Sequence, residues 1–337
     1  MSFDAAIFGT LSQNERPSED ALRKALTAIL NGEAASEQIS ALLLGLEMIG
    51  LSGREVRVGT EVMRANMVPV SIDADVIDIV GTGGTGLHTL SISTATAIVS
   101  AAAGASVAKH GNRAASSLTG TADTLSELGV NLAVGPERTA EIIKSVGLGF
   151  LFAPNHHPAM RHVGPARKAL GIRTLFNLLG PMSNPAGARR MLLGVCDDGW
   201  RRPMAEALRD TGVDHVWVVH GHDGMDEITT TGPTSITEVR GKHIKDFELS
   251  PQSFGIDLAS LDVLRGGAPA QNAEALRDLL DGNASAYRDI VVLNSGAALM
   301  LAGQATSVPE GIDMAVAAID SFSARKTLDA LVRETNQ

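Results

Sequence analysis

The stretch from residue 76 to residue 113 constrains the fold of this chain most strongly. Residues 76–80 form a short apolar run typical of a buried strand, and residues 91–103 predict a helix that begins with Ser and Thr. Residues 106–108 then predict a second strand. A strand–helix–strand unit of this kind predicts a parallel sheet with helices on its faces. Ligands of such sheets bind beyond the carboxyl ends of the strands.

The same stretch is free of acidic residues. No Asp or Glu occurs between Ile79 and Ala122, although the formal net charge of the 337-residue chain is -10. This window contains the glycine loop 81–86 and the cationic motif Lys-His-Gly-Asn-Arg at 109–113. Glycines let backbone N–H groups approach phosphate oxygens, a following helix presents its positive end, and a lysine adds a balancing charge. The pattern predicts a site for a phosphorylated small molecule.

The glycine loop also matches the dinucleotide fingerprint Gly-x-Gly-x-x-Gly at Gly81, Gly83 and Gly86. That fingerprint needs an acidic residue about 20 residues further on for the ribose hydroxyls, and the sequence has none there. This disfavours NAD, while Arg113 leaves an NADP enzyme as an alternative. The Gly-Lys-Ser/Thr ending of a nucleotide-binding P-loop is absent as well. Four glycines in six residues still favour a phosphate loop over a purely structural turn.

Two further motifs carry chemistry. Asp226 and Glu227 follow a predicted strand at 216–219, and adjacent carboxylates in such a place suit Mg²⁺, which accompanies substrate phosphates. A solvated acidic turn is the alternative interpretation. His156 and His157 lack a third ligand at zinc spacing, so they favour a substrate-pocket or capping role over a zinc site.

Composition restricts the class of protein. With 44% hydrophobic and 20% charged residues, the chain has the balance of a globular protein with a sizeable core. Aromatic residues make up 3%, which argues against a stacking surface for single-stranded nucleic acid, and the negative charge argues against general DNA binding. The lone Cys196 excludes an internal disulfide and predicts a small buried apolar residue. We expect no signal peptide and no membrane span, and hence a cytoplasmic protein.

Periodicity predicts how the rest of the chain is organised. Apolar residues at helical spacing follow Ser18, Ser36 and Ser52, so the chain up to about residue 67 predicts helices that pack together. The proline-containing segment 67–70 is the natural boundary. Beyond it, strands are predicted at 149–153, 191–196 and 216–219, and helices at 121–128, 136–146, 158–170, 174–179, 202–211, 273–280, 291–302 and 311–321.

A series of short motifs occurs in order along nearly the whole chain. They are Gly81-Thr82-Gly83-Gly84, Ser93-Thr94-Ala95, Lys109-His110-Gly111-Asn112-Arg113, His157-Pro158-Ala159-Met160, Arg167, Phe176-Asn177-Leu178-Leu179-Gly180-Pro181, Asn184-Pro185 and Asp226-Glu227. Together they resemble the anthranilate phosphoribosyltransferase family. The Lys-His-Gly-Asn-Arg and Asn-Leu-Leu-Gly-Pro blocks are the most specific of them.

The resemblance implies an α/β fold of the nucleoside phosphorylase-like phosphoribosyltransferase type. A small N-terminal helical domain is expected at residues 1–70, joined by about 174–187, and an α/β phosphoribosyl-binding domain with a mainly parallel central sheet at 71–337. The implied activity transfers the 5-phosphoribosyl group from phosphoribosyl pyrophosphate (PRPP) to anthranilate. It gives N-(5-phosphoribosyl)anthranilate and pyrophosphate in tryptophan biosynthesis. Mg²⁺ is the implied cofactor, and a homodimer joined through the helical domain is the implied assembly.

The resemblance also implies roles for individual residues. PRPP is expected to contact Gly81, Gly83, Gly84, Thr89, Ser91, Ser93, Thr94, Lys109 and Thr121. Anthranilate is expected to contact Gly81, His110, Asn112, His157, Arg167 and Pro181, with Arg167 pairing its carboxylate. The expected metal ligands are Ser93, Asp226 and Glu227, and the expected catalytic residues are Lys109, Asp226 and Glu227.

The sequence departs from the family pattern at two positions. Thr85 stands where the family commonly has Asp, and Ser91 where it commonly has Asn. We expect altered PRPP or Mg²⁺ handling without loss of activity, because Thr and Ser can still form hydrogen bonds. Two alternatives are a pyrimidine nucleoside phosphorylase of the same fold, which has different lysine and serine blocks, and a non-catalytic relative that binds nucleic acid, which the negative charge disfavours.

Overall fold

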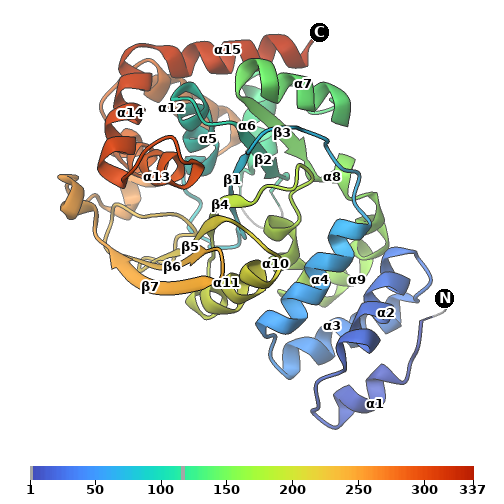
Figure 1. The fold of residues 1–337 in the computed structure, drawn as a ribbon. Helices are drawn as coiled ribbons and strands as arrows, with labels where there is room; N and C mark the ends of the chain where they lie inside the picture. Colours follow the sequence, from blue (N-terminus) through green and yellow to red (C-terminus); the bar gives the residue numbers. More distant parts are fainter. Residues whose placement is uncertain (1–2, 115–117) are drawn as a thin grey trace.

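Four helices at the start of the chain form a bundle at one end of the molecule (Figure 1). The structure, a computed structural model, describes residues 3–114 and 118–337. The bundle helices are α1 (Ile7–Ser12), α2 (Glu19–Leu30), α3 (Ser36–Met48) and α4 (Gly53–Ala65). Ser18 and Ser52 cap α2 and α4 with their hydroxyl groups, as their sequence positions predict.

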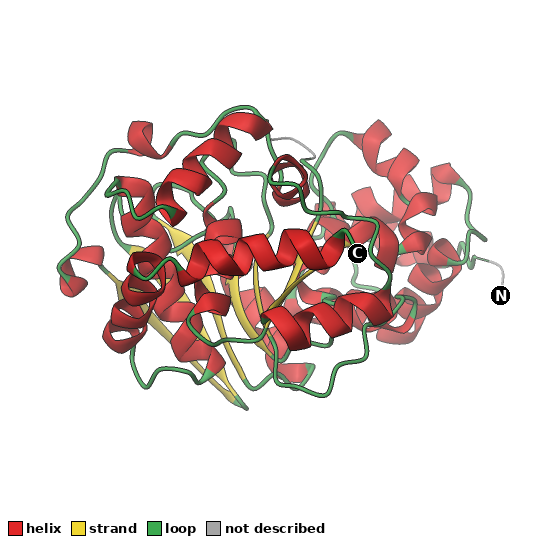
Figure 2. Ribbon diagram, turned by 90° about the horizontal axis from the view of Figure 1, so that it is seen from above, coloured by secondary structure: helices red, strands yellow, loops and turns green. Residues whose placement is uncertain are grey.

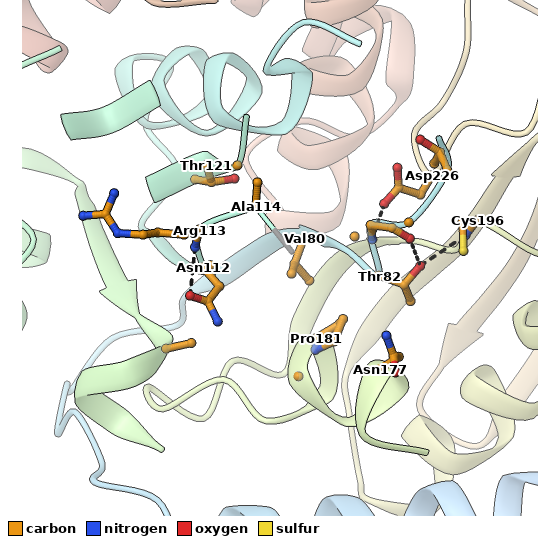
Figure 3. A pocket seen from close by; sticks show the side chains of 18 of the residues that line it. Val80, Thr82, Asn112, Arg113, Ala114, Thr121, Asn177, Pro181, Cys196 and Asp226 are labelled. Atoms are coloured by element: carbon orange, nitrogen blue, oxygen red, sulfur yellow. Dashed lines mark hydrogen bonds between the residues drawn. The ribbon is translucent and has the colours of Figure 1, made fainter. Parts of the chain in front are cut away.

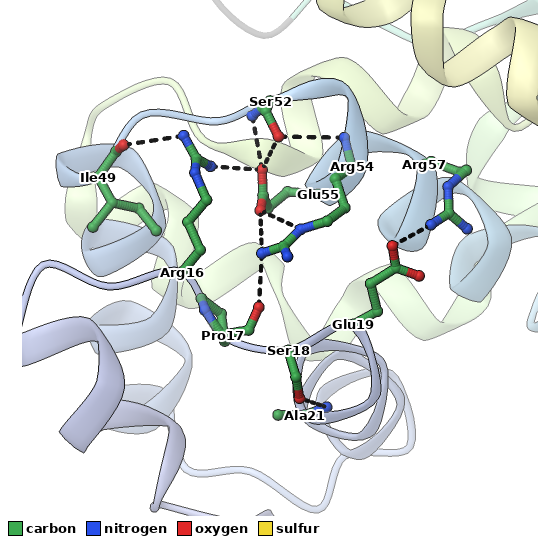
Figure 4. A network of polar contacts seen from close by, with 10 residues as sticks. All are labelled: Arg16, Pro17, Ser18, Glu19, Ala21, Ile49, Ser52, Arg54, Glu55 and Arg57. Atoms are coloured by element: carbon green, nitrogen blue, oxygen red, sulfur yellow. Dashed lines mark hydrogen bonds and ion pairs between the residues drawn. The ribbon is translucent and has the colours of Figure 1, made fainter.

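A buried carboxylate fixes how these helices meet (Figure 4). Glu55 is fully buried and accepts hydrogen bonds from the backbone N–H and hydroxyl of Ser52 and from the guanidinium groups of Arg16 and Arg54. Arg54 also donates to the carbonyl of Pro17 at 2.8 Å. Burial alone would raise the pKa of Glu55, but the Ser52 and arginine contacts outweigh it and lower the pKa. The network ties α4 to the linker between α1 and α2.

A seven-stranded sheet forms the centre of the larger part, in the order β3-β2-β1-β4-β5-β6-β7 (Figures 1 and 2). The strands are β1 (Ile77–Gly81), β2 (Val107–Gly111), β3 (Leu148–Phe152), β4 (Arg190–Gly194), β5 (His215–Gly221), β6 (Thr234–Arg240) and β7 (His243–Leu249). Strands β1 to β5 pair in parallel, which confirms the mainly parallel sheet, and β6 and β7 extend it antiparallel. These last two strands were not predicted from the sequence.

Alternate residues of the central strands enter two separate cores. Leu192 and Trp217 pack against α5 (Ile92–Ala102) and the C-terminal helices. Their neighbours Met191, Leu193 and Val218 face the opposite way, into a core that α11 (Arg201–Asp210) and the helical bundle share. Because helices cover both faces, these strands are apolar on both sides. The second core is continuous from the sheet into the bundle, so it joins the two parts of the molecule.

The remaining helices mostly follow the predicted alternation. They are α6 (Thr121–Glu127), α7 (Pro136–Val146), α8 (Ala153–His156), α9 (Gly164–Leu170), α10 (Leu175–Met182), α12 (Pro269–Leu280), α13 (Ala286–Ala302), α14 (Val308–Asp320) and α15 (Ser323–Thr335), with 3-10 turns η1 (Pro158–His162), η2 (Asp198–Trp200), η3 (Pro251–Phe254) and η4 (Leu261–Leu264). The single helix predicted at 158–170 was wrong, because the chain forms η1 and then α9. Pro165 lies in the first turn of α9 and has no N–H, so it cannot continue the helical hydrogen bonds from η1.

The segment from η1 to α10 lies against the bundle, although it follows three strands of the sheet. Val163, Ala166, Leu175 and Leu179 all belong to the core that the bundle shares. The segment therefore stands between the bundle and the sheet. The domain boundary after residue 70 stays a prediction. Within residues 3–114 and 118–337, no helix is both long and apolar enough to cross a membrane.

Candidate active site

A cavity of about 1050 Å³ opens where the parallel strands end, facing the α9–α10 segment (Figure 3). Every residue for which the sequence analysis expects a binding, catalytic or metal role lines it. These residues are Gly81, Gly83, Gly84, Thr89, Ser91, Ser93, Thr94, Lys109, His110, Asn112, Thr121, His157, Arg167, Pro181, Asp226 and Glu227. The fold thus gathers positions more than a hundred residues apart around one space, while their individual roles stay predictions.

The glycine loop is shaped to expose its backbone. Gly83, Gly84 and Gly86 have φ angles of 65°, 78° and 71°, a region that residues with a side chain rarely adopt. The loop leads into α5, whose N-terminus carries a positive dipole and has no side-chain cap from Ser91 in the described structure. Near it, the buried Thr94 Oγ1 has no hydrogen-bond partner among the described residues. This is the geometry of an anion site.

Two glycines make room for Asp226. Gly81 and Gly194 are paired across β1 and β4. A Cβ on Gly194 would lie 1.5 Å from the backbone oxygen of Asp226, and a Cβ on Gly81 would lie 2.2 Å from Oδ2. That same Oδ2 accepts the N–H of Gly83 at 2.8 Å (Figure 3). The glycine loop and the carboxylate loop therefore form one unit. The role of Gly194 was not predicted from the sequence, where it stands out only as a small residue at the end of a strand.

Lys109 brings a buried positive charge to the cavity. It lies within β2, is 2% exposed, and donates from Nζ to the carbonyl of Ile79 and to Ser93 Oγ at 3.2 Å. Burial lowers the pKa of Lys109 to about 8, although the carboxylates of Asp78, Glu227 and Asp226 oppose the shift. At pH 7 the ammonium group is therefore still protonated and available to a negatively charged ligand.

Asp226 and Glu227 are partly open to the cavity but lie deep in the protein, and this burial raises the pKa of both. Repulsion from Asp226 raises the pKa of Glu227 further. Glu227 Oε2 is buried without a hydrogen-bond partner in the described part of the chain. A carboxylate pair in this condition fits a hard cation better than a purely structural role.

The protein offers a metal only part of a coordination shell here. Among the residues that the structure describes, no group of three or more His, Cys, Asp or Glu side chains could hold an ion. Two carboxylates with the rest of the shell supplied by water and phosphate oxygens is the usual arrangement for Mg²⁺. The residues present therefore fit Mg²⁺ that arrives with a phosphorylated substrate.

His110 and His157 form a pair on the cavity wall. Their ring centroids are 5.1 Å apart, and they are 3% and 6% exposed. Burial lowers the pKa of His110 to about 3 and that of His157 to about 4, so both rings are neutral at pH 7. The Nε2 atoms of both rings are buried without a hydrogen-bond partner among the described residues.

Arg167 brings a further, partly buried positive charge to the cavity wall. It lies on α9, and burial lowers the pKa of its guanidinium group. No carboxylate of the described chain pairs with it, whereas most other arginines have such partners. A partly buried guanidinium without a counter-ion is suited to a planar carboxylate ligand. Asn112, just after β2, and Pro181, on α10, reach the same cavity (Figure 3).

A second layer of residues supports the site from behind, and sequence reasoning gave it no role. Asp78 is fully buried and accepts hydrogen bonds from the N–H of His110 at 3.1 Å and from Asn184 Nδ2 at 2.7 Å. Asn184 also donates to the carbonyl of Ala108. Burial raises the pKa of Asp78 to about 6. The sequence feature that could have indicated this role is Asp78 itself, an acidic residue within an otherwise apolar strand.

The two departures from the family pattern both have local partners. Thr85 Oγ1 accepts the N–H of Leu87 at 3.2 Å, and Ser91 Oγ shares a 2.7 Å hydrogen bond with Thr124. Cys196 differs from the expectation of a buried apolar residue. It is only half-buried and lines the cavity near Gly84, where the guanidinium group of Arg173 donates to its Sγ at 3.2 Å.

The fold and this site together define a glycosyl transferase that handles a phosphorylated sugar. The helical bundle domain of a glycosyl transferase family matches residues 6–67, and the α/β domain of the same family matches residues 73–325. Both parts of the expected fold are thereby confirmed.

Individual relatives make the assignment more specific. An anthranilate phosphoribosyltransferase of Parvibaculum lavamentivorans is 54% identical over 93% of this chain and 92% of its own length. The enzyme of that name from Mesorhizobium japonicum is 51% identical, with 93% of each chain covered. The chain belongs to the anthranilate phosphoribosyltransferase family, which confirms the resemblance and the enzyme class expected from its motifs.

Solved structures agree with this assignment. The anthranilate phosphoribosyltransferase of Thermus thermophilus has a TM-score of 0.93 and 40% identity, covering 98% of this chain and 99% of that one. The Saccharomyces cerevisiae enzyme in complex with PRPP and Mg has a TM-score of 0.90 and 27% identity, covering 98% and 97%. The same yeast enzyme has also been solved with 4-fluoroanthranilate.

Proposed function

We propose that the cavity binds PRPP along the sheet and anthranilate along the α9–α10 segment, and transfers the 5-phosphoribosyl group between them. The products are N-(5-phosphoribosyl)anthranilate and pyrophosphate, a step of tryptophan biosynthesis. The proposal rests mainly on the presence of two separate positively charged groups in one cavity. An anion site with Lys109 lies at the strand ends, and the unpaired cation Arg167 lies on α9.

PRPP is assigned to the sheet side of the cavity. Backbone N–H groups of the glycine loop, the N-terminus of α5 and the Lys109 ammonium group would hold its phosphate oxygens. The residues that we assign to it are Gly81, Gly83, Gly84, Thr89, Ser91, Ser93, Thr94, Lys109 and Thr121. Thr85 stands where the family commonly has Asp, so the PRPP side of the cavity has one negative charge fewer.

The cation is assigned to Asp226 and Glu227, with the Ser93 hydroxyl beside them. Bound Mg²⁺ would supply charge neutralisation for the pyrophosphate leaving group. The unpartnered Oε2 of Glu227 is the free acceptor that such a cation needs. Asp226 has a second task, because its bond to the N–H of Gly83 holds the glycine loop in place.

Anthranilate is assigned to the other side, against Gly81, His110, Asn112, His157, Arg167 and Pro181. Arg167 would pair with its carboxylate. An aromatic amine is already uncharged at pH 7, so the site needs to orient its nitrogen toward C1 of the ribose more than to activate it. Lys109, which we place among the catalytic residues with Asp226 and Glu227, would stabilise the negative charge that develops on pyrophosphate.

We also propose a homodimer joined through the helical bundle. Leu44 and Met48 on α3 are 42% and 77% exposed, and such apolar side chains on a small bundle support a contact there. Sedimentation velocity would test this, since a monomer at micromolar concentration contradicts it.

The reaction can be followed directly in the intrinsic fluorescence of anthranilate. We expect the fluorescence to decay when the purified protein, PRPP and Mg²⁺ are all present, with one pyrophosphate released per anthranilate consumed. Omission of any one component, or addition of EDTA, should stop the decay. Phosphate-dependent cleavage of a pyrimidine nucleoside, without loss of anthranilate, would instead favour the nucleoside phosphorylase alternative.

A further inference from the structure

Helix α13 holds the chain directly behind the carboxylate pair. Asn294 on this helix is 2% exposed, and its amide binds both backbone groups of Ile228, the residue that follows Glu227. Oδ1 accepts the N–H of Ile228 at 3.0 Å, and Nδ2 donates to the carbonyl of Ile228 at 2.7 Å. Nδ2 also donates to the carbonyl of Ile290 at 2.8 Å, which fixes the amide on its own helix. One buried side chain therefore sets where the backbone beside Glu227 lies.

The same helix also holds the first residue of the α5 end. Tyr287 is 3% exposed, and its hydroxyl group donates to the carbonyl of Ser91, the N-cap residue of α5, at 3.0 Å. Burial and repulsion from Glu227 raise the pKa of Tyr287, so its hydroxyl group stays protonated and remains a donor. Ser91 Oγ is held separately by Thr124. The N-terminus of α5, to which we assign phosphate, is thus anchored to α13 as well.

The two anchors lie on one face of a helix that is itself fixed. Tyr287 and Asn294 are seven positions apart (294 − 287), about two helical turns or 10 Å along the axis. A Cβ on Gly296 would lie 2.9 Å from a backbone oxygen of α14, so α13 and α14 are in close backbone contact. Arg190 on β4 donates to the carbonyl of Leu301 at 2.8 Å, near the other end of α13. The helix has the rigidity that a spacer needs.

We propose that α13 sets the distance between the metal carboxylates and the phosphate end of α5, with Asn294 and Tyr287 as its two positioning residues. This inference rests on the proposed function and deepens it. In that function one PRPP molecule contacts both ends, with phosphate oxygens at α5 and its cation at Asp226 and Glu227, so their spacing limits how well it binds. Neither Tyr287 nor Asn294 lines the cavity, so each acts through the backbone that it holds.

Calorimetric titration of PRPP in Mg²⁺ and in EDTA measures this spacing without turnover. Only with the cation does one ligand join both ends of the site, so a change of spacing should weaken binding in Mg²⁺ and not in EDTA. For Asn294→Ala we expect the Kd for PRPP in Mg²⁺ to rise by about tenfold or more, the usual effect of removing a residue that holds a metal ligand. The Kd in EDTA and the KM for anthranilate should each change by less than about twofold.

Tyr287→Phe removes one hydroxyl group and keeps the buried ring, so this variant should fold even if Asn294→Ala is unstable. We expect its Kd for PRPP to rise about fivefold in Mg²⁺, the value of one neutral hydrogen bond, and to stay near the wild-type value in EDTA. Leu299→Ala is the matched control, because Leu299 is fully buried on the same helix and does not line the cavity. It should lower the melting temperature but leave both Kd values within about twofold of wild type.

The double variant Asn294→Ala/Tyr287→Phe tests whether the helix acts as one spacer. Once one anchor is lost the spacing is no longer fixed, so the second substitution should add less than about twofold, whereas two independent anchors would multiply their effects. Full multiplication, equal weakening in Mg²⁺ and EDTA, or a Tyr287→Phe variant with wild-type affinity overturns the inference. The same selective loss in Leu299→Ala also overturns it. A wild type that consumes no anthranilate, or binds PRPP equally in Mg²⁺ and EDTA, refutes the proposed function itself.

Discussion

At the scale of single residues, Glu227 is a group whose burial opposes its charge. Burial and repulsion from Asp226 raise its pKa, so the folded protein favours the protonated form. We expect Glu227→Gln to raise the free energy of unfolding at pH 8, because it removes that charge. The same change should lower activity by at least tenfold and raise the Mg²⁺ concentration needed for half-maximal rate.

Urea denaturation and Mg²⁺ titrations measure the two effects of Glu227→Gln. Asp223→Asn is a less suitable control, since Asp223 binds Thr229 and Thr231. Glu37→Gln is the better control, because Glu37 is an exposed carboxylate in the first turn of α3. Unchanged Mg²⁺ dependence in Glu227→Gln would remove this residue from the metal site.

The buried histidines predict how stability depends on pH. The pKa of His157 is lowered from 6.5 to about 4 by burial, so the unfolded chain binds a proton between these values and the folded protein does not. Its contribution to stability is therefore present above about pH 6.5 and is lost as the pH falls toward about 4. His157→Gln should make the loss of unfolding free energy between pH 7 and pH 5 smaller by about 2 kcal/mol.

Asp78 acts in the opposite direction within the same range. Its pKa is raised to about 6, so its protonation below that pH favours the folded state. Comparing urea denaturation of His157→Gln and wild type at pH 7, 6 and 5 cancels this shared effect. An identical pH dependence in both proteins would show that His157 is protonated normally in the folded state.

At the scale of elements, the end of β4 determines whether the carboxylate loop can approach the glycine loop. A methyl group on residue 194 would overlap the backbone of Asp226, which has no flexible end to move away. Gly194→Ala should therefore displace Asp226, break its bond to Gly83, and lower kcat/KM for PRPP by at least about 100-fold. Gly232→Ala is the matched control, because open space surrounds its Cβ position. Equal activity in the two variants would contradict this account.

The helical bundle depends on Glu55 at the start of α4. Glu55→Gln keeps the shape but loses the charge that two arginines and the Ser52 groups bind. We expect it to lower the free energy of unfolding by about 2 kcal/mol, because buried hydrogen bonds to a charged group are lost. Differential scanning calorimetry measures this loss. A change in the free energy of unfolding of less than about 0.5 kcal/mol would show that the charge of Glu55 does not stabilise the bundle.

Elements with strong periodicity were predictable from the sequence, and those with weak periodicity were not. Helices α2 and α4 have serine caps and apolar faces, and β1, β4 and β5 are apolar runs, so their positions agree with prediction. Helix α3 also lies where its periodicity predicts, although Ala35 and not a serine is its N-cap residue, and the short α1 was not predicted. β7 is an edge strand that is mostly exposed and charged, and α15 follows only a short turn after α14. Local sequence carries little signal for such peripheral elements.

At the scale of the whole molecule, the position of the site followed from topology. Parallel strands end at one edge of the sheet, so motifs after β1, β2 and β5 were predictable neighbours. Gly194, Asp78 and Asn184 were not predictable in the same way. They act through contacts with residues far along the chain, and only the packed structure shows which residues these are.

The central claim is that two substrates bind in one cavity, PRPP along the sheet and anthranilate along the α9–α10 segment. Two-substrate steady-state kinetics on wild type, Arg167→Gln and Lys109→Gln test it most directly. We predict that Arg167→Gln raises KM for anthranilate by about 30-fold and leaves KM for PRPP within about twofold, because only a carboxylate partner is lost. Lys109→Gln should impair PRPP use and leave anthranilate affinity nearly unchanged. If both variants shift both constants together, or if Arg167→Gln leaves anthranilate unaffected, the division of the cavity is wrong.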